Sequence, residues 1–101
     1  MSDRYILDGH TPVPCDDLMK WGAWFERANR SVDTTSVGPM RVSTVFLGLD
    51  HSFGSGAPIL FETMIFGMGD DEYQTRCSTW EEAEKMHRAA VDVATQRERL
   101  R

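Results

Sequence analysis

The sequence predicts a small α+β domain in which an antiparallel sheet packs with two helices. Two runs of β-branched and aromatic residues, 40–50 and 59–67, flank the glycine-rich connection HSFGSGAP and predict a central hairpin. A segment with apolar residues at helical spacing lies on each side of this hairpin. Because 101 residues suffice for one hydrophobic core and not for two, we expect a single domain, 1–101, with frayed ends at 1–4 and 96–101.

The N-terminal region predicts a short hairpin that leads into a helix. Tyr5–Leu7 has the composition of a short strand, and Asp8-Gly9 is a strong two-residue turn signal. Pro12 and Pro14 exclude a long central strand after the turn and are typical of the approach to a helix.

The first helix is predicted from about Cys15 to Asn29. Its apolar residues recur every three or four positions and form one face: Leu18, Trp21, Trp24, Phe25 and Ala28. The segment from Asn29 to Gly38 is polar and short-chained, which is typical of a connecting loop.

The central hairpin presents two faces if its connection closes symmetrically. One face would carry Val45, Leu47, Leu49, Leu60, Glu62 and Met64, and the other Thr44, Phe46, Ile59, Phe61 and Ile65. Both sets are largely apolar, so we expect each face to be covered, either by the two helices separately or by a second chain in a homodimer.

A third strand and a second helix complete the predicted domain. Alternation through EYQTRCS predicts the strand, joined to the hairpin by an acidic turn at 69–71. Ser78 or Thr79, with Glu81 or Glu82 three residues later, forms a capping box at the helix start. The buried stripe of this helix would contain Trp80, Ala83, His87, Ala90, Val91 and Ala94.

The composition favours a protein of the cytoplasm. A net charge of -5 argues against a nucleic-acid partner. The two cysteines, Cys15 and Cys77, match neither a disulfide scaffold nor a metal motif, and the N-terminus lacks a signal-peptide pattern. The most apolar stretch, 42–67, is interrupted by charged and glycine residues, so we expect no membrane segment.

Three polar residues stand out within the apolar hairpin. Glu62, inside ILFETMIF, is either a functional carboxylate or an ion-paired one, with Arg41 or Arg76 as the partner. Asp50 and His51 end a strand before flexible glycines, so they form either an Asx-type turn or the base of a binding loop.

The sequence contains no pattern that is typical of a catalytic or metal-binding site. His87 lies on the apolar stripe of the last helix, where a hydrogen-bonded structural histidine is the favoured interpretation. The three histidines follow no metal-ligand spacing, and neither cysteine nor any serine lies in a nucleophile motif. We therefore expect no catalytic residues, no metal and no cofactor.

The order of three segments resembles a known group of proteins. YILDGHTPVPCDDLMKWGAWFE, VSTVFLGLDHSFGSGAPILFETMIFG and YQTRCSTWEEAEKMH are similar to short, mostly uncharacterised proteins of tailed bacteriophages and prophages, with their recurring G-L-D-H-x-F, L-F-E-T-M and S-T-W-x-E-A patterns. This resemblance implies an accessory factor in the host cytoplasm that binds a bacterial host protein, such as an inhibitor of CRISPR or another defence system.

Two hypotheses of function follow. The first is a protein-binding module whose surface includes the hairpin loop and the acidic turn, with candidate binding residues Asp50, His51, Phe53, Glu62, Asp70, Asp71 and Glu72. The alternative is a small-molecule-sequestering protein or a minimal hydrolase, which requires Asp50, His51 and Glu62 to converge in one pocket.

Overall fold

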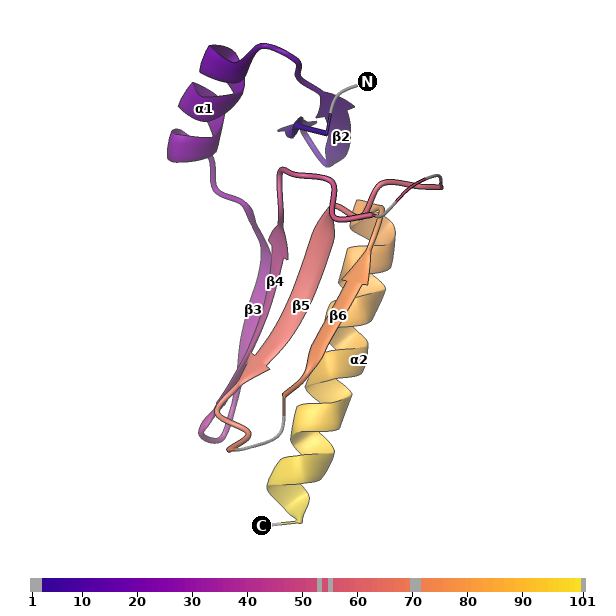
Figure 1. Cartoon of the computed structure of the whole chain (residues 1–101). Coiled ribbons are helices and arrows are strands. Elements are labelled where there is room, and N and C mark those ends of the chain that lie inside the picture. Colours follow the sequence, from indigo (N-terminus) through magenta and orange to yellow (C-terminus); the bar gives the residue numbers. More distant parts are fainter. Residues whose placement is uncertain (1–2, 53, 55, 70–71, 101) are drawn as a thin grey trace.

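The computed structural model describes residues 3–52, 54, 56–69 and 72–100, and it confirms the predicted α+β class. The described residues form two helices and six strands, in the order β1 (Tyr5–Asp8), β2 (Thr11–Pro14), α1 (Leu18–Arg27), β3 (Ser31–Val37), β4 (Met40–Phe46), β5 (Phe61–Phe66), β6 (Gln74–Cys77) and α2 (Trp80–Arg99). The molecule is elongated, 48 × 30 × 24 Å, with the β1–β2 hairpin and α1 above one end of the larger sheet (Figure 1).

The larger sheet is an antiparallel meander in the order β3-β4-β5-β6. The predicted central hairpin is confirmed as β4 and β5, which pair with Thr44 opposite Thr63 and Val45 opposite Glu62. Both strands are shorter than predicted. Gly48, which adopts a positive φ of 77°, turns the chain away from the ladder soon after β4 ends.

Strand β3 corrects the prediction of a loop at 29–38. Thr34 lies opposite Ser43 and Thr35 opposite Val42 in an antiparallel ladder that is regular from Asp33 to Val37. The segment forms a sheet edge, where polar side chains face solvent, so the low hydrophobicity that suggested a loop is compatible with a strand. Gly38, at φ 56°, opens the tight turn that joins β3 to β4.

One face of the sheet is buried under α2 (Figure 1). Along β4 and β5 the side chains under the helix are Met40, Val42, Thr44, Phe46, Phe61, Thr63 and Ile65, all buried. They pack with Ala83, Ala90 and Ala94 of α2 in two neighbouring clusters. These three alanines let the helix backbone approach the sheet closely.

No described helix covers the opposite face, which corrects the prediction that the two helices cover the two faces separately. Cover by a second chain stays a prediction. Alternation along the strands puts Arg41, Glu62 and Arg76 on this face, together with Met64 and Phe66. The predicted grouping of Val45, Glu62 and Met64 on one face is confirmed. Leu60 is an exception, because it precedes β5 and is buried in the core beside Phe46 and Phe61.

Helix α1 packs at the end of the sheet rather than on its exposed face. Trp24 meets Phe46 edge-on, with ring centroids 5.8 Å apart. The indole N–H of Trp21 donates to the carbonyl oxygens of Tyr5 (3.1 Å) and Gly48 (3.2 Å). Leu18, predicted on the apolar face, is 59% exposed, which corrects that part of the prediction.

Helix α2 begins at the predicted capping box. The Thr79 hydroxyl accepts from the Glu82 N–H, and the Glu82 carboxylate accepts from the Thr79 N–H, each at 3.1 Å. The helix continues to Arg99. The His10 ring stacks on Trp80 at a centroid distance of 3.8 Å, which ties the β1–β2 hairpin to the helix start. Neither described helix is long and apolar enough to cross a membrane.

Candidate functional site

The loop that follows β4 is organised by Asp50. Its Oδ1 accepts hydrogen bonds from the backbone N–H groups of Ser52 (2.8 Å) and Ile59 (2.9 Å). The Ser52 N–H, with a smaller contribution from Ile59, lowers the pKa of Asp50. The interpretation of Asp50 as an Asx-type turn is therefore confirmed. His51 is half-buried beside it, and Phe53 lies outside the described residues.

Glu62 has two partners from the neighbouring strand. Its Oε2 accepts from Arg76 Nε (2.9 Å) and from Gln74 Nε2 (2.8 Å). The interpretation of Glu62 as an arginine-paired carboxylate is confirmed, with Arg76 as the partner. Arg41 instead lies over the Phe66 ring, 4.8 Å from its centroid.

The carboxylates of Asp50 and Glu62 are engaged in separate hydrogen-bond sets. The partners of Glu62 come from β6, whereas those of Asp50 come from its own loop. Within the part of the chain that the structure describes, no group of three or more histidine, cysteine, aspartate or glutamate side chains could hold a metal ion. The geometry thus describes structural roles for both carboxylates.

His87 forms a buried polar network between α2 and the sheet. Its Nδ1 lies 2.7 Å from Thr44 Oγ1, which is in turn 2.5 Å from Thr63 Oγ1. Its Nε2 lies 2.9 Å from Thr35 Oγ1. Burial lowers the pKa of His87, and the charge of Asp33, 3.7 Å away, opposes this shift. The predicted hydrogen-bonded structural histidine is confirmed, and at 2% exposure it is out of reach of a substrate.

The two cysteines are free, and Cys15 is buried. Burial, with a smaller contribution from the charge of Glu82, raises the pKa of Cys77 to about 11. The thiol therefore stays protonated at neutral pH, which makes Cys77 a poor nucleophile.

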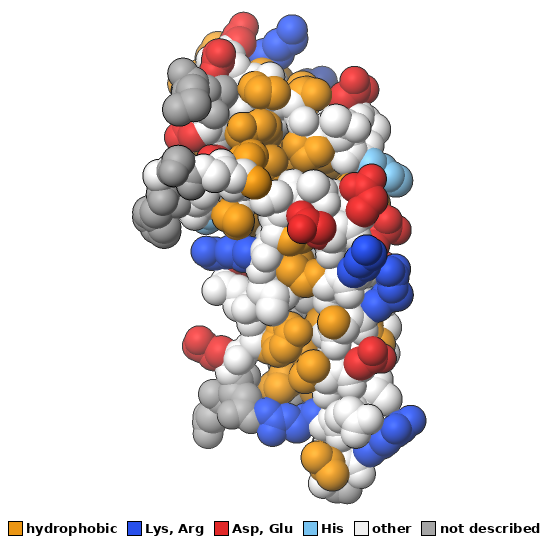
Figure 2. Space-filling view, turned by 90° about the vertical axis from the view of Figure 1, so that its right-hand side faces the viewer, with side chains coloured by type: hydrophobic (Ala, Val, Ile, Leu, Met, Phe, Trp, Pro, Cys, Tyr) orange, Lys and Arg blue, Asp and Glu red, His pale blue; other side chains and the backbone are white. Residues whose placement is uncertain are grey.

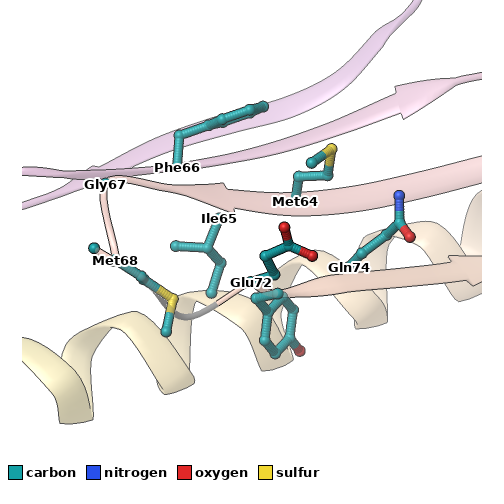
Figure 3. Close-up of a pocket in the computed structure, with 9 residues that line it drawn as sticks. Met64, Ile65, Phe66, Gly67, Met68, Glu72 and Gln74 are labelled. Carbon is teal, nitrogen blue, oxygen red and sulfur yellow. The ribbon is translucent and has the colours of Figure 1, made fainter.

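A pocket of about 300 Å³ lies between the end of β5 and the start of β6. Its lining is Met64, Ile65, Phe66, Gly67, Met68, Gly69, Glu72, Tyr73 and Gln74. Figure 3 shows Met64 and Phe66 extending from the exposed side of β5, while Ile65 and Met68 point toward α2. The Glu72 carboxylate lies between these two groups.

Sequence reasoning found only part of this pocket. It pointed to Glu72 through the acidic turn, but Asp70 and Asp71 lie outside the described residues. The alternating large apolar residues Met64, Phe66 and Met68 were the available signal. They were missed because, without knowledge of what covers each face, alternation cannot separate an exposed apolar side chain from a core one.

No protein-family model, no curated protein and no solved structure matches the chain.

Proposed function

We propose that this protein acts by binding a partner protein, and that the pocket between the end of β5 and the start of β6 receives an apolar side chain of that partner. The observation that carries the proposal is the apolar lining of this pocket, at which one large side chain, Phe66, is exposed. Phe66 is 42% exposed, on a sheet face that no described element covers. Large apolar side chains in such a position are typical of interaction surfaces.

The chemistry of the lining favours a protein partner over a small polar ligand. Thioether side chains such as Met64 and Met68 adapt to different apolar shapes. The volume of about 300 Å³ is at the lower limit for small-molecule sites and suits one or two inserted side chains. The negative charge of Glu72 at the pocket favours a partner that carries a basic residue next to the inserted apolar side chain. The net charge of the whole chain, -5, is also negative and favours a basic partner surface.

The class of partner follows from the resemblance of the three quoted segments to phage accessory proteins. A phage-encoded factor meets its targets in the host cytoplasm, so the proposed partner is a bacterial host protein. A component of a defence system such as CRISPR is the specific class that this resemblance suggests. Support for this step is analogy between sequences, whereas support for the pocket is structural.

The test is quantitative affinity capture from bacterial lysate with matched variants. Phe66→Ser removes the aromatic ring at the pocket, and Leu18→Ser removes an apolar side chain of α1 that is more exposed, 59% against 42%. We expect the wild type and Leu18→Ser to recover the same host protein and Phe66→Ser to recover at least about tenfold less. Equal recovery by both variants would contradict the proposal.

A further inference from the structure

We propose that two copies of the chain pair through β6, so that their sheets join into one antiparallel sheet about a two-fold axis at Thr75. This inference does not depend on the proposed function, because the pairing needs no host protein. It rests on the free edge of β6, on an unpaired buried hydroxyl at Thr75, and on a register in which the β6 side chains complement their own copies.

Strand β6 ends the sheet, since within the described residues it pairs only with β5. The Ile65 N–H donates to the Tyr73 carbonyl at 3.3 Å, and Thr75 lies opposite Thr63. In an antiparallel ladder, alternate residues turn their backbone groups to opposite sides. Thr75 therefore directs its N–H and C=O toward β5, while Gln74 and Arg76 direct theirs outward. These outward groups are a template for another strand.

One register uses all of the outward groups. When Gln74 pairs with the partner's Arg76, and Arg76 with the partner's Gln74, each pair exchanges two backbone hydrogen bonds. Thr75 then lies opposite the partner's Thr75 in a non-hydrogen-bonded position, where facing side chains are closest. The arrangement is symmetric and closed, as most homodimers are.

The Thr75 hydroxyl supports this register independently. Its Oγ1 is buried, yet it has no hydrogen-bond partner among the described residues. The next two threonines of the same cross-strand row, Thr63 and Thr44, bond to each other at 2.5 Å. Rotation of Thr75 between staggered χ1 rotamers would let it bond the partner's Thr75, which extends this row across the axis.

The side chains that flank the axis are also complementary. On the face that α2 covers, the large ring of Tyr73 lies opposite the small side chain of the partner's Cys77. On the exposed side, Arg76 binds Glu62 through Nε, which leaves its Nη groups for the Oε1 atom of the partner's Gln74. No two like charges meet in the central pairs.

An apolar strip beside the edge gives the second copy a surface to cover. Figure 2 shows hydrophobic side chains in a column down this side of the molecule. Cys77 and Met86 pack at the margin of one core cluster and Tyr73 at the margin of the other. Val93 is 39% exposed and lies seven residues after Met86, hence on the same side of α2.

The opposite edge, β3, lacks the feature that marks β6. Among the described residues no buried hydroxyl of β3 is without a partner, and the register of β3 shifts between Ser31 and Asp33, which disfavours pairing at that end of the strand. An extended peptide from another protein could also pair with β6, but it would not supply the second Thr75. A second copy is therefore the occupant that the described residues favour.

The first test compares proline and alanine at position 74. The Gln74 N–H points outward, so Gln74→Pro removes a bond of the dimer and none of the monomer ladder, at a strand start where proline is tolerated. We expect analytical ultracentrifugation to show dimers for the wild type, and a dissociation constant for Gln74→Pro at least about tenfold above that of Gln74→Ala, which loses the same side chain but keeps the N–H. Circular dichroism should show an unchanged fold. A wild type that stays monomeric at micromolar concentrations overturns the proposal.

The second test fixes the register. In a Cys77→Ser background, Thr75→Cys puts two thiols across the axis at a Cα separation of about 4.5 Å, within the range that a disulfide spans. Mild oxidation should give a covalent dimer, whereas Ser36→Cys on β3 should not. Equal cross-linking of the two variants, or a dimer that Thr75→Cys does not link, means that another interface forms and overturns the proposal.

Discussion

His87 is 2% exposed, and each nitrogen of its ring has a threonine hydroxyl partner. Because one nitrogen of a neutral imidazole donates and the other accepts, the hydroxyls of Thr35 and Thr44 satisfy both nitrogens of the neutral ring. Glu62 and Asp50 are likewise satisfied by their neighbours. These polar residues thus have structural roles: His87 joins α2 to the sheet, Glu62 joins β5 to β6, and Asp50 orders its own loop.

The first prediction concerns pH. Burial holds the pKa of His87 in the folded protein below the value of 6.5 expected for the unfolded chain. As the pH falls, the unfolded chain binds the proton first, so the free energy of unfolding decreases from about pH 7 to pH 5. The midpoint of urea unfolding should fall over this window.

The variant His87→Gln isolates this contribution. It should lose about 1–3 kcal/mol at neutral pH, because Thr35 and Thr44 lose a partner. The slope of its unfolding midpoint between about pH 7 and pH 5 should also be smaller than that of the wild type. Identical slopes would show that other groups cause the pH dependence.

The second prediction concerns the Glu62–Arg76 ion pair. Arg76 is 38% exposed, so solvent screens the pair. Glu62→Gln keeps the size of the side chain and should change the free energy of unfolding by no more than about 1 kcal/mol in a urea titration. A loss of several kcal/mol would indicate a buried, tightly coupled carboxylate instead.

At the scale of elements, α1 is held by its approach to Gly48. A Cβ at Gly48 would lie 2.8 Å from the Phe25 ring, and the φ of 77° disfavours any other residue. Gly22, within α1, has no atom within 4 Å of the place where a Cβ would be. The two glycines therefore differ in what they contribute: Gly48 allows a close approach, whereas Gly22 does not.

The third prediction compares alanine at these two glycines. Gly22→Ala should stabilise the protein by about 0.5–1 kcal/mol, because alanine favours the helix. Gly48→Ala should destabilise it by about 1–3 kcal/mol through backbone strain and the clash with Phe25. Thermal unfolding of both variants measures the difference. A Gly48→Ala protein as stable as the wild type would mean that α1 packs loosely.

Elements with a repeated apolar pattern could be predicted from sequence, and others could not. The β4–β5 hairpin and α2 carry alternation, helical periodicity and a capping box, so local pattern and tertiary position agree. β3 was missed because its ladder with β4 stabilises a segment whose own side chains are mostly polar. The pocket was missed for a related reason, since its residues look like core until the uncovered sheet face is known.

At the scale of the whole molecule, the N-terminal hairpin is joined to the rest through a few specific contacts. The His10–Trp80 stack lies at one of them. The Asp50 N–H donates to the Asp3 carbonyl at 2.8 Å, and the backbones of Arg4 and Leu49 form an isolated antiparallel β-bridge. Tyr5 and Leu7 also pack against the core cluster that contains Phe46 and Phe61, so the hairpin is fastened to the end of the sheet.

The fourth prediction follows from this attachment. His10→Ala removes the stack and should speed amide hydrogen exchange in β1 and β2 at least about threefold, while exchange in β4 and β5 stays unchanged. Thr11→Ala, at the neighbouring exposed position, is the matched control and should leave exchange unaltered. Faster exchange throughout the sheet would mean that the hairpin and the sheet open together.

Helix α2 contacts each of the four strands of the larger sheet, and it follows all of them along the chain. During synthesis, the strands therefore leave the ribosome before their cover exists. Val42, Phe46 and Phe61 stay exposed on the nascent chain until α2 has emerged. Folding of this domain must then be completed late in translation, and an early stop within α2 would release a sheet with an exposed apolar face that is prone to aggregation.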